Sequence, residues 1–203
     1  MEMRMIAEGA EANIYSCSFV GMRAVAKRRV RKEYRIGSLD MYLRTHRTKV
    51  EARVMLALSG RIKMPRVLAV TADTIYMDFI DGRRLSTLPV GKGIEAYLVE
   101  SGRWLAIMHD SGITHGDFTP ANIIVWGGAA YVIDFGLSYF TDSIEDKAID
   151  LLLMKRSVNK ELFSVFMRSY DSAAKYSRPV KERLADIELR GRYQSRSLAT
   201  VRS

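Results

Sequence analysis

Two short motifs on either side of a predicted β-hairpin constrain this chain more than any other feature. The first is His-Gly-Asp-Phe-Thr-Pro-Ala-Asn at residues 115–122, and the second is Ile-Asp-Phe-Gly at residues 133–136. Between them, two apolar runs surround a Gly-Gly pair at 127–128, a pattern typical of a tight hairpin. We therefore expect Asn122 and Asp134, at the two ends of the hairpin, to lie close together in space.

The side chains of these motifs suit phosphoryl transfer. That reaction needs the phosphates held, their charge neutralised by Mg²⁺ and the attacking oxygen positioned. Mg²⁺ prefers hard oxygen ligands, which the carboxylate of Asp134 and the amide oxygen of Asn122 supply. Asp117 precedes Asn122 in the same motif, where its carboxylate can accept a proton from a hydroxyl group or orient a water molecule. The sequence therefore predicts a metal site at Asn122 and Asp134 and a catalytic role for Asp117.

These motifs resemble the H-R-D-x-x-x-x-N and D-F-G signatures of protein kinases, with Gly116 in place of the usual arginine. Upstream, Ala-Val-Ala-Lys at residues 24–27 resembles the V-A-I-K lysine strand, and Glu51 lies on a predicted helix after it. The resemblance implies that Lys27 holds the α- and β-phosphates of ATP, pairs with Glu51 and is catalytically essential.

Two further segments complete the nucleotide site that the resemblance implies. Met-Asp-Phe-Ile at residues 77–80 ends a predicted strand and looks like the gatekeeper and hinge that meet adenine through backbone groups. The phosphate loop at residues 9–15 has one glycine instead of the usual three, so it must approach phosphates differently. The residues expected to contact the nucleotide, besides Lys27 and Glu51, are Gly9, Ala10, Glu11, Ala12, Met77, Asp78 and Ile80.

The pattern of elements predicts an α+β, two-lobed, protein-kinase-like fold. Residues 1–80 are expected to form a small N-terminal lobe of strands plus a regulatory helix. Residues 81–189 would form a reduced, mainly helical C-terminal lobe that carries the catalytic loop and the metal site. Residues 190–203 are basic and lack a sustained apolar helical pattern, so we expect a flexible tail.

Within the first lobe, the apolar runs predict five strands, at residues 5–7, 13–20, 22–28, 67–70 and 75–80. Ser38 is placed to cap a helical region that ends near Leu58. Thr48 and Glu51 fit a capping box, which predicts a break near His46 and a new helix after it.

Three departures from the protein-kinase pattern narrow the family. The phosphate loop has a single glycine, Thr119 stands where serine/threonine kinases carry a lysine toward the γ-phosphate, and only a short segment separates Gly136 from Asp150. Asp150 looks like the buried aspartate that supports the catalytic loop. With these departures, the chain resembles the atypical kinase of the KEOPS (EKC) complex, of PRPK or Bud type. The matching segments are 8–12, 32–35, 39–40, 43–44, 47–48, 51–53, 115–119, 134–138 and 145–151.

This resemblance implies an atypical Mg-ATP-dependent serine/threonine kinase or ATPase that supports threonylcarbamoyladenosine modification of tRNA. The implied cofactors are ATP and Mg²⁺. The implied partners are a Kae/OSGEP-type tRNA threonylcarbamoyltransferase subunit, a small Cgi/TPRKB-type subunit at the N-terminal lobe, and tRNA within the complex. In that family a basic tail reaches toward tRNA, and the segment at 190–196 matches it in part.

Three other functions fit part of the pattern. Small-molecule kinases of the aminoglycoside or choline type also use H-G-D-x-x-x-x-N, but their acceptor sites are usually built from extra acidic helices, whereas the C-terminal region here is short and basic. A pseudokinase scaffold would not need Lys27, Asp117, Asn122 and Asp134 together. A RIO-type ribosome-assembly kinase shares the short segment after Asp-Phe-Gly, although the phosphate loop fits it less well.

Charge and cysteine content agree with a nucleotide- or RNA-binding protein of the cytoplasm. The formal net charge is +9, with basic residues gathered at 23–35 and 178–202, which favours polyanionic ligands. Cys17 is the only cysteine, so no intramolecular disulfide can form and a reducing compartment is expected. No apolar run is long enough for a membrane span.

Overall fold

An antiparallel sheet forms the N-terminal lobe of the protein, for which a computed structural model describes residues 3–89, 91 and 93–200, with side chains to residue 190. The sheet order is β1-β2-β3-β5-β4, and every neighbouring pair is antiparallel. The strands are β1 (Met3–Ala7), β2 (Ala12–Phe19), β3 (Met22–Arg29), β4 (Val67–Val70) and β5 (Thr74–Asp78). The five strands predicted from the sequence are therefore confirmed, with ends that differ by one or two residues.

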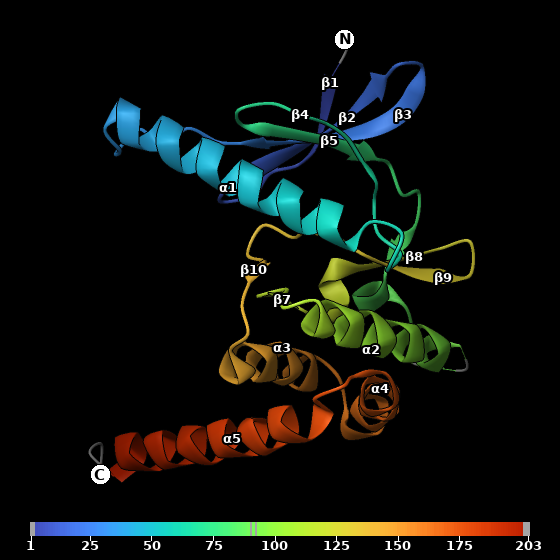
Figure 1. The fold of residues 1–203 in the computed structure, drawn as a ribbon, viewed down its shortest axis with the longest axis vertical. Helices are drawn as coiled ribbons and strands as arrows, with labels where there is room; N and C mark the ends of the chain where they lie inside the picture. The colour runs from blue at the N-terminus through green and yellow to red at the C-terminus, as the bar shows by residue number, and fades with distance from the viewer. Residues whose placement is uncertain (1–2, 90, 92, 201–203) are drawn as a thin grey trace.

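Helix α1 (Gly37–Leu58) crosses beneath this sheet as one continuous helix (Figure 1). Two of our expectations about it are wrong. Ile36, not Ser38, occupies the N-cap position, and no side chain caps the helix there. The capping box does not form either, because the Thr48 hydroxyl donates to the carbonyl of Arg44 at 2.8 Å, and the Glu51 side chain binds cations of the sheet. The helix therefore does not break near His46.

The C-terminal lobe begins with short elements that lead into its helices. The elements are β6 (Arg83–Arg84), η1 (Leu85–Thr87), α2 (Ile94–Asp110), β7 (Ile113–Thr114), η2 (Pro120–Asn122), β8 (Ile123–Trp126), β9 (Ala129–Val132), β10 (Tyr139–Phe140), α3 (Ile144–Ser157), α4 (Lys160–Ala173) and α5 (Ser177–Thr200). Strands β6, β8 and β9 form one small sheet, and β7 pairs with β10. The two-lobed α+β arrangement predicted from the sequence is confirmed.

The predicted hairpin consists of β8 and β9, which pair antiparallel from Ile123 opposite Val132. Gly127 and Gly128 form its turn with φ of +56° and +74°, left-handed values that glycine adopts without steric cost. Beyond the strands, the backbone N–H of Ile133 donates to the carbonyl of Asn122 at 2.9 Å. The hairpin thus brings Asn122 next to the residue that precedes Asp134.

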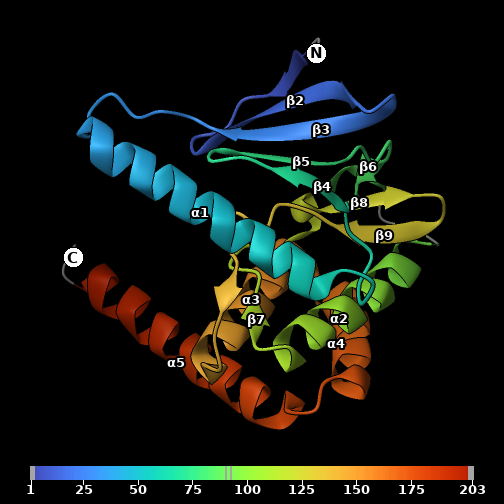
Figure 2. The same ribbon diagram turned by 45° about the horizontal axis from the view of Figure 1, so that its top comes forward.

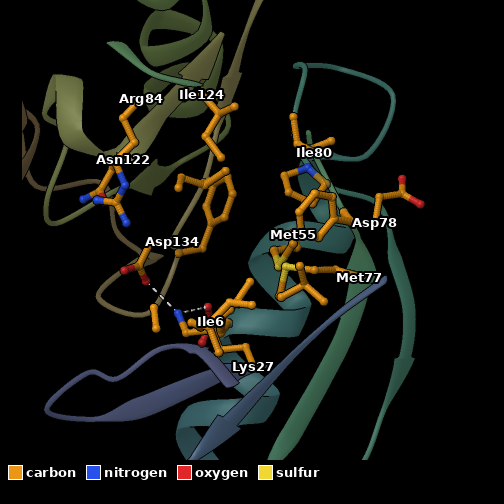
Figure 3. Close-up of a pocket in the computed structure, with 18 residues that line it drawn as sticks. Ile6, Lys27, Met55, Met77, Asp78, Ile80, Arg84, Asn122, Ile124 and Asp134 are labelled. Atoms are coloured by element: carbon orange, nitrogen blue, oxygen red, sulfur yellow. Dashed lines mark hydrogen bonds and ion pairs between the residues drawn. The ribbon is translucent and has the colours of Figure 1, made fainter. Parts of the chain in front are cut away.

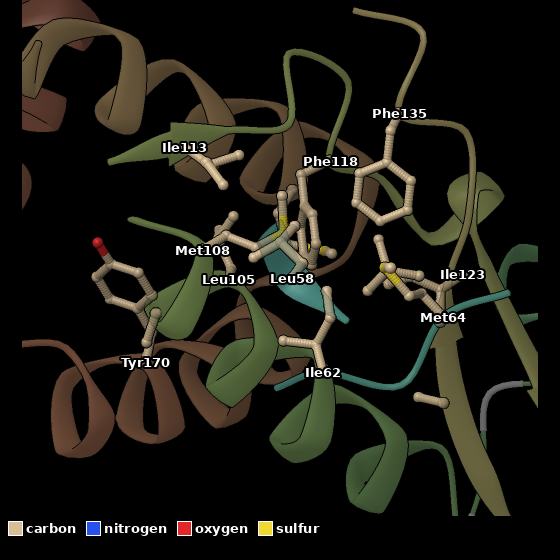
Figure 4. Close-up of a cluster of buried hydrophobic side chains, with 14 of the residues drawn as sticks. Leu58, Ile62, Met64, Leu105, Met108, Ile113, Phe118, Ile123, Phe135 and Tyr170 are labelled. Atoms are coloured by element: carbon tan, nitrogen blue, oxygen red, sulfur yellow. The ribbon is translucent and has the colours of Figure 1, made fainter. Parts of the chain in front are cut away.

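One buried apolar cluster joins the two lobes. Leu58, at the end of α1, packs in this cluster with Met108 of α2 and with Phe118 and Phe135 of the two motifs (Figure 4). Phe118 and Phe135 have exposed fractions of 0% and 1%. The two motifs are therefore anchored in the core through their phenylalanines, while Asn122 and Asp134 line the cavity between the lobes.

Helix α5 extends into the segment 190–203, for which we expect a flexible tail, and that expectation stays a prediction (Figure 2). Helix α5 runs without interruption from Ser177 to Thr200, so the secondary structure does not break at residue 190. Once a helix is established, each further residue adds a hydrogen bond at little cost, and many residues beyond 190 are good helix formers. The division of the chain near residues 80 and 190 stays a prediction. Among the described residues, no helix has both the length and the apolar character that a membrane span needs.

Candidate nucleotide-binding site

A cavity of about 350 Å³ lies between the sheet of the N-terminal lobe and the β8–β9 hairpin (Figure 3). Its walls are mostly apolar, with Val25 and Met77 from the sheet and Ile124 from the hairpin. The polar side chains that line it are Lys27, Glu51, Asp78, Arg84, Asn122 and Asp134. A concave, apolar space with a few converging polar groups is the form that small-ligand sites take in proteins.

Lys27 forms the centre of the charged end of this cavity. Its ammonium group lies 2.6 Å from Glu51 Oε1 and 2.6 Å from Asp134 Oδ1. Burial alone would lower the pKa of Lys27, but the two carboxylates outweigh that effect and hold the pKa above its usual value of 10.5. Lys27 is thus a fixed positive charge, and the predicted pairing with Glu51 is confirmed.

Glu51 has a second cationic partner that our sequence analysis missed. Arg29 is 5% exposed, and its Nη2 lies 2.7 Å from Glu51 Oε2. Lys27 and Arg29 are two residues apart on β3, so their side chains project from the same face of the sheet. The period-2 pattern of the strand was therefore the signal that could have identified Arg29.

Asp134 adopts an unusual backbone conformation at the rim of the cavity. Its φ is +62°, a left-handed value that is uncommon for a residue other than glycine. Burial raises the pKa of this carboxyl, but Lys27 and the backbone N–H of Gly136 hold the pKa below its usual 3.8. A Cβ atom on Gly136 would lie 3.0 Å from Lys27 Nζ and 3.1 Å from Asp134 Oδ1. Glycine at this position keeps the space around the Lys27–Asp134 pair open.

Asn122 lines the charged end of the cavity and binds Asp117, which is not itself among the cavity-lining residues. Asn122 Nδ2 donates to the Asp117 carbonyl at 2.9 Å and to Asp117 Oδ2 at 2.7 Å. Because both partner atoms only accept, the amide nitrogen must face Asp117, and the amide oxygen is left for another partner. An amide oxygen and an exposed carboxylate on the two ends of one hairpin fit the oxygen ligands that Mg²⁺ takes.

Asp150 of α3 binds the backbone of the loop that contains the His-Gly-Asp motif. Its carboxylate accepts the backbone N–H groups of His115 at 2.8 Å and of Gly116 at 2.9 Å. Gly116 has a φ of +80°, and a Cβ there would lie 2.5 Å from the carbonyl oxygen of Leu137. This close approach explains why glycine replaces the arginine of the usual motif. The supporting role expected for Asp150 matches this geometry.

A buried hydrogen-bond chain extends behind Asp150, and sequence reasoning did not identify it. His109 Nε2 lies 3.2 Å from Asp150 Oδ2, and His109 Nδ1 lies 2.8 Å from the Tyr170 hydroxyl. Burial lowers the pKa of His109 despite the adjacent carboxylate, so the ring is neutral. Asp150 only accepts, so Nε2 carries the proton and Tyr170 donates to Nδ1. The chain fixes the orientation of Asp150.

The other residues predicted to bind nucleotide fall into two groups. Met77, Asp78 and Ile80 line the cavity, although the Asp78 carboxylate turns to Arg66, at 2.6 Å from its Nε. The phosphate-loop residues Gly9, Ala10, Glu11 and Ala12 are not among the cavity-lining residues. Instead, this loop is tied to the region of α1. Lys32 Nζ donates to the Ala10 carbonyl, and Arg47 pairs with Glu11.

Comparison with known proteins identifies the family. A profile of the RIO domain matches residues 13–178. The KEOPS complex subunit Bud32 of Pyrococcus abyssi is 36% identical, over 98% of this chain and 100% of the relative. The chain belongs to the Bud32 family of RIO-domain proteins.

The chain is also 35% identical to a probable bifunctional tRNA threonylcarbamoyladenosine biosynthesis protein of Methanothermobacter thermautotrophicus. That match covers 93% of this chain but 36% of the relative, so a Bud32-like chain spans about a third of that protein's length.

A solved structure confirms the kinase-like fold of this Bud32-family chain. The Rio2 kinase–ADP/Mg²⁺–phosphoaspartate complex from Chaetomium thermophilum superposes with a TM-score of 0.67. The identity is 16%, and the match covers 95% of this chain and 70% of the Rio2 chain. At that identity, the similarity establishes the fold and not the substrate.

Proposed function

We propose that the cavity binds Mg-ATP and that the chain is an ATP-dependent phosphotransferase and ATPase of the KEOPS complex, which supports threonylcarbamoyladenosine formation on tRNA. The single observation that carries the proposal is the position of Lys27, held between Glu51 and Asp134 at 2.6 Å from each, in a cavity that Asn122 also lines. Full-length similarity to Bud32 proteins supports the assignment to KEOPS.

Each predicted site residue has a role in this proposal. Lys27, oriented by Glu51, binds the α- and β-phosphates, and Asn122 and Asp134 hold the metal. Mg²⁺ bound there neutralises the phosphate charge. Asp117 is oriented by Asn122 and accepts the proton of the attacking hydroxyl or orients a water.

The adenine end and the phosphate loop complete the proposed site. Backbone groups of Met77, Asp78 and Ile80 meet the adenine at the apolar end of the cavity. The loop formed by Gly9, Ala10, Glu11 and Ala12 approaches the phosphates from the sheet. The contacts of this loop with Lys32 and Arg47 fix the distance between the loop and the phosphates.

The partners follow from the family. We propose that the chain binds a Kae/OSGEP-type threonylcarbamoyltransferase subunit, a small Cgi/TPRKB-type subunit at the N-terminal lobe, and tRNA within the complex, in the cytoplasm. Aminoglycoside or choline kinase activity and ribosome assembly are less favoured, because the agreement with Bud32 extends over the full length of the relative.

The proposal is tested by measuring ATP hydrolysis with the purified chain alone, with the transferase subunit, and with the transferase plus tRNA. We expect turnover that requires Mg²⁺ and rises when transferase and tRNA are both present. The matched control replaces tRNA with an aminoglycoside or with choline, which should not stimulate hydrolysis. Stimulation by the small molecule and not by tRNA would contradict the assignment.

A further inference from the structure

The cavity has a second cationic side chain, Arg84, which has no role in the ATP-binding site proposed so far. Among the 18 residues that line the cavity, Lys27 and Arg84 are the two with positive charge. Lys27 is balanced by two carboxylates at 2.6 Å. Within the part of the chain that the structure describes, the Arg84 side chain donates one hydrogen bond, from Nη1 to the backbone carbonyl of Ala121 at 3.1 Å. A carbonyl carries no net charge, so the charge of Arg84 is available to a ligand.

Strand β6 places Arg84 on the side of the cavity that Asn122 also lines. Strand β6 pairs with β8, with Arg84 opposite Ile124, the second residue after Asn122. A Cβ atom on Gly82 would overlap the carbonyl oxygen of Val125, so only glycine allows this close approach of the chain to β8. Figure 3 shows the Arg84 side chain beside Asn122, on the side of the cavity that carries Asp134 and away from Met77. Arg84 therefore lies at the phosphate end.

The guanidinium group of Arg84 is suited to binding a phosphate. A guanidinium group has five N–H donors in a planar fork that matches phosphate oxygens, and one of them is used on Ala121. Lys27 projects from β3 of the N-terminal sheet, whereas Arg84 projects from β6 and binds Ala121, in the motif that also contains Asp117. A phosphate that contacts Arg84 is thus the one nearest the catalytic loop, the terminal phosphate.

We propose that Arg84 binds the terminal phosphate of the nucleotide, so that this chain supplies from β6 a positive charge that Thr119 cannot supply from the catalytic loop. This inference rests on the proposed function, because it presumes that the cavity binds ATP. It makes Arg84 a residue that distinguishes ATP from ADP in this protein.

The neighbouring Arg83 provides a matched control. It lies on the same strand and has the same charge, but it does not line the cavity, and its Nη2 donates to the carbonyl of Thr87. Arg83→Gln and Arg84→Gln therefore change the net charge equally. Both side chains are exposed, so both variants should fold like the parent.

The experiment is calorimetric titration of the parent and both variants with adenosine, ADP and a non-hydrolysable ATP analogue, with Mg²⁺ present. For Arg84→Gln, we expect affinity for the ATP analogue to fall by roughly tenfold or more, the usual effect of losing a charge-assisted hydrogen bond. ADP affinity should fall less and adenosine affinity should not change, and Arg83→Gln should bind all three like the parent. Arg84→Lys should restore part of the loss.

Two results would overturn the inference. Equal losses for Arg83→Gln and Arg84→Gln would show a general charge effect, and an equal loss of adenosine and ATP-analogue affinity would place Arg84 at the ribose. Failure of the parent to bind any of the three ligands would instead reject the proposed function itself, together with the inference.

Discussion

At the scale of single residues, the site is a small network of charges that share partners. Glu51 is 2% exposed and binds Lys27 with one oxygen and Arg29 with the other. A buried carboxylate with two cations is stable only while its partners remain, because an unpaired buried charge is costly. Arg29 therefore belongs to the machinery that orients Lys27, although it does not line the cavity.

Replacement of Arg29 tests this reading. Because Lys27 would still pair with Glu51, we expect Arg29→Met to lower the free energy of unfolding by about 1–3 kcal/mol, the range for leaving one buried polar partner unsatisfied. Arg28→Met is the control, since Arg28 lies on the other face of β3 with 61% of its side chain exposed. Urea unfolding curves measure both variants. Equal stability losses for the two would contradict the account.

The two buried histidines predict how stability depends on pH. Burial lowers the pKa of His109 and of His115 below the usual 6.5. Below about pH 6.5, the unfolded chain therefore binds protons that the folded protein excludes. Stability should fall as the pH falls through this range, by up to about 1.4 kcal/mol per pH unit for each histidine. We expect urea unfolding between pH 7.5 and 5.5 to show this slope.

Variants of single histidines identify the source of that slope. His109→Gln and His115→Gln should each make it shallower, because each removes one imidazole whose pKa is lowered by burial. A slope that persists in full in His109→Gln would show that other groups produce it.

The sequence predicted the polar side chains that line the cavity, except Arg84, whereas the predicted residues 9–12 and Asp117 do not line it. Local sequence motifs were enough to identify Lys27, Glu51, Asn122 and Asp134. The roles of Arg29, Arg84 and the His109–Tyr170 pair depend on contacts between distant segments. For Tyr170 and His109, no local pattern indicates the pairing, because α4 and α2 meet only in the folded protein.

At the scale of elements, contacts between distant segments determine features of the helices that local sequence propensity does not predict. The capping box predicted at Thr48 and Glu51 does not form, because Glu51 pairs instead with two buried cations of the sheet, Lys27 and Arg29. Helix α1 is therefore continuous through this segment. The Gly-Gly turn of the β8–β9 hairpin was predictable, because positive φ at two successive residues is a local requirement.

Gly102 tests how closely α2 and α4 must approach. A Cβ there would lie 2.5 Å from the Phe166 carbonyl oxygen and 3.1 Å from the Tyr170 backbone nitrogen. Since backbone atoms cannot move aside separately, Gly102→Ala should destabilise the protein by about 1–3 kcal/mol despite the better helix propensity of alanine. Gly37→Ala is the control, because a Cβ there meets nothing within 4 Å. A thermal midpoint for Gly102→Ala at or above that of the parent would contradict the packing argument.

Deletion of residues 190–203 tests the RNA-binding role that the family resemblance implies for this basic segment. Two of the ion pairs that hold α5 to α3, Lys155 with Glu188 and Arg183 with Glu145, precede residue 190. The third, Arg190 with Glu145 at 3.7 Å, is lost in the deletion, but its side chains are largely exposed and such a pair contributes little stability. We therefore expect deletion of residues 190–203 to leave the thermal midpoint nearly unchanged. It should weaken tRNA binding by the assembled complex and make the affinity less dependent on salt, because fewer phosphates are neutralised. Binding curves with identical affinity and salt slope would show that the segment has no role in RNA binding.

At the scale of the whole molecule, one apolar core joins the lobes and leaves the charged groups between them. Met55 and Leu58 of α1 share that core with Phe118 and Phe135, so Glu51, one turn before Met55, has a fixed position relative to the catalytic loop. The sequence could predict the lobes from the motif order, but it could not predict this shared core. The core is what makes the Lys27–Glu51–Asp134 geometry a property of the whole fold.

The most direct test of the central claim is Mg²⁺-dependent ATP hydrolysis by Asp134→Ala, compared with the parent and with Gly37→Ala as a folded control, each in the presence of the transferase subunit and tRNA. The claim is that Lys27 and Asp134 hold the phosphates and the metal, and loss of a metal ligand leaves the phosphate charge poorly stabilised. We expect Asp134→Ala to abolish turnover, and we expect Lys27→Ala and Asp117→Ala to reduce it nearly as much. A folded Asp134→Ala protein that hydrolyses ATP at the parental rate would contradict the account.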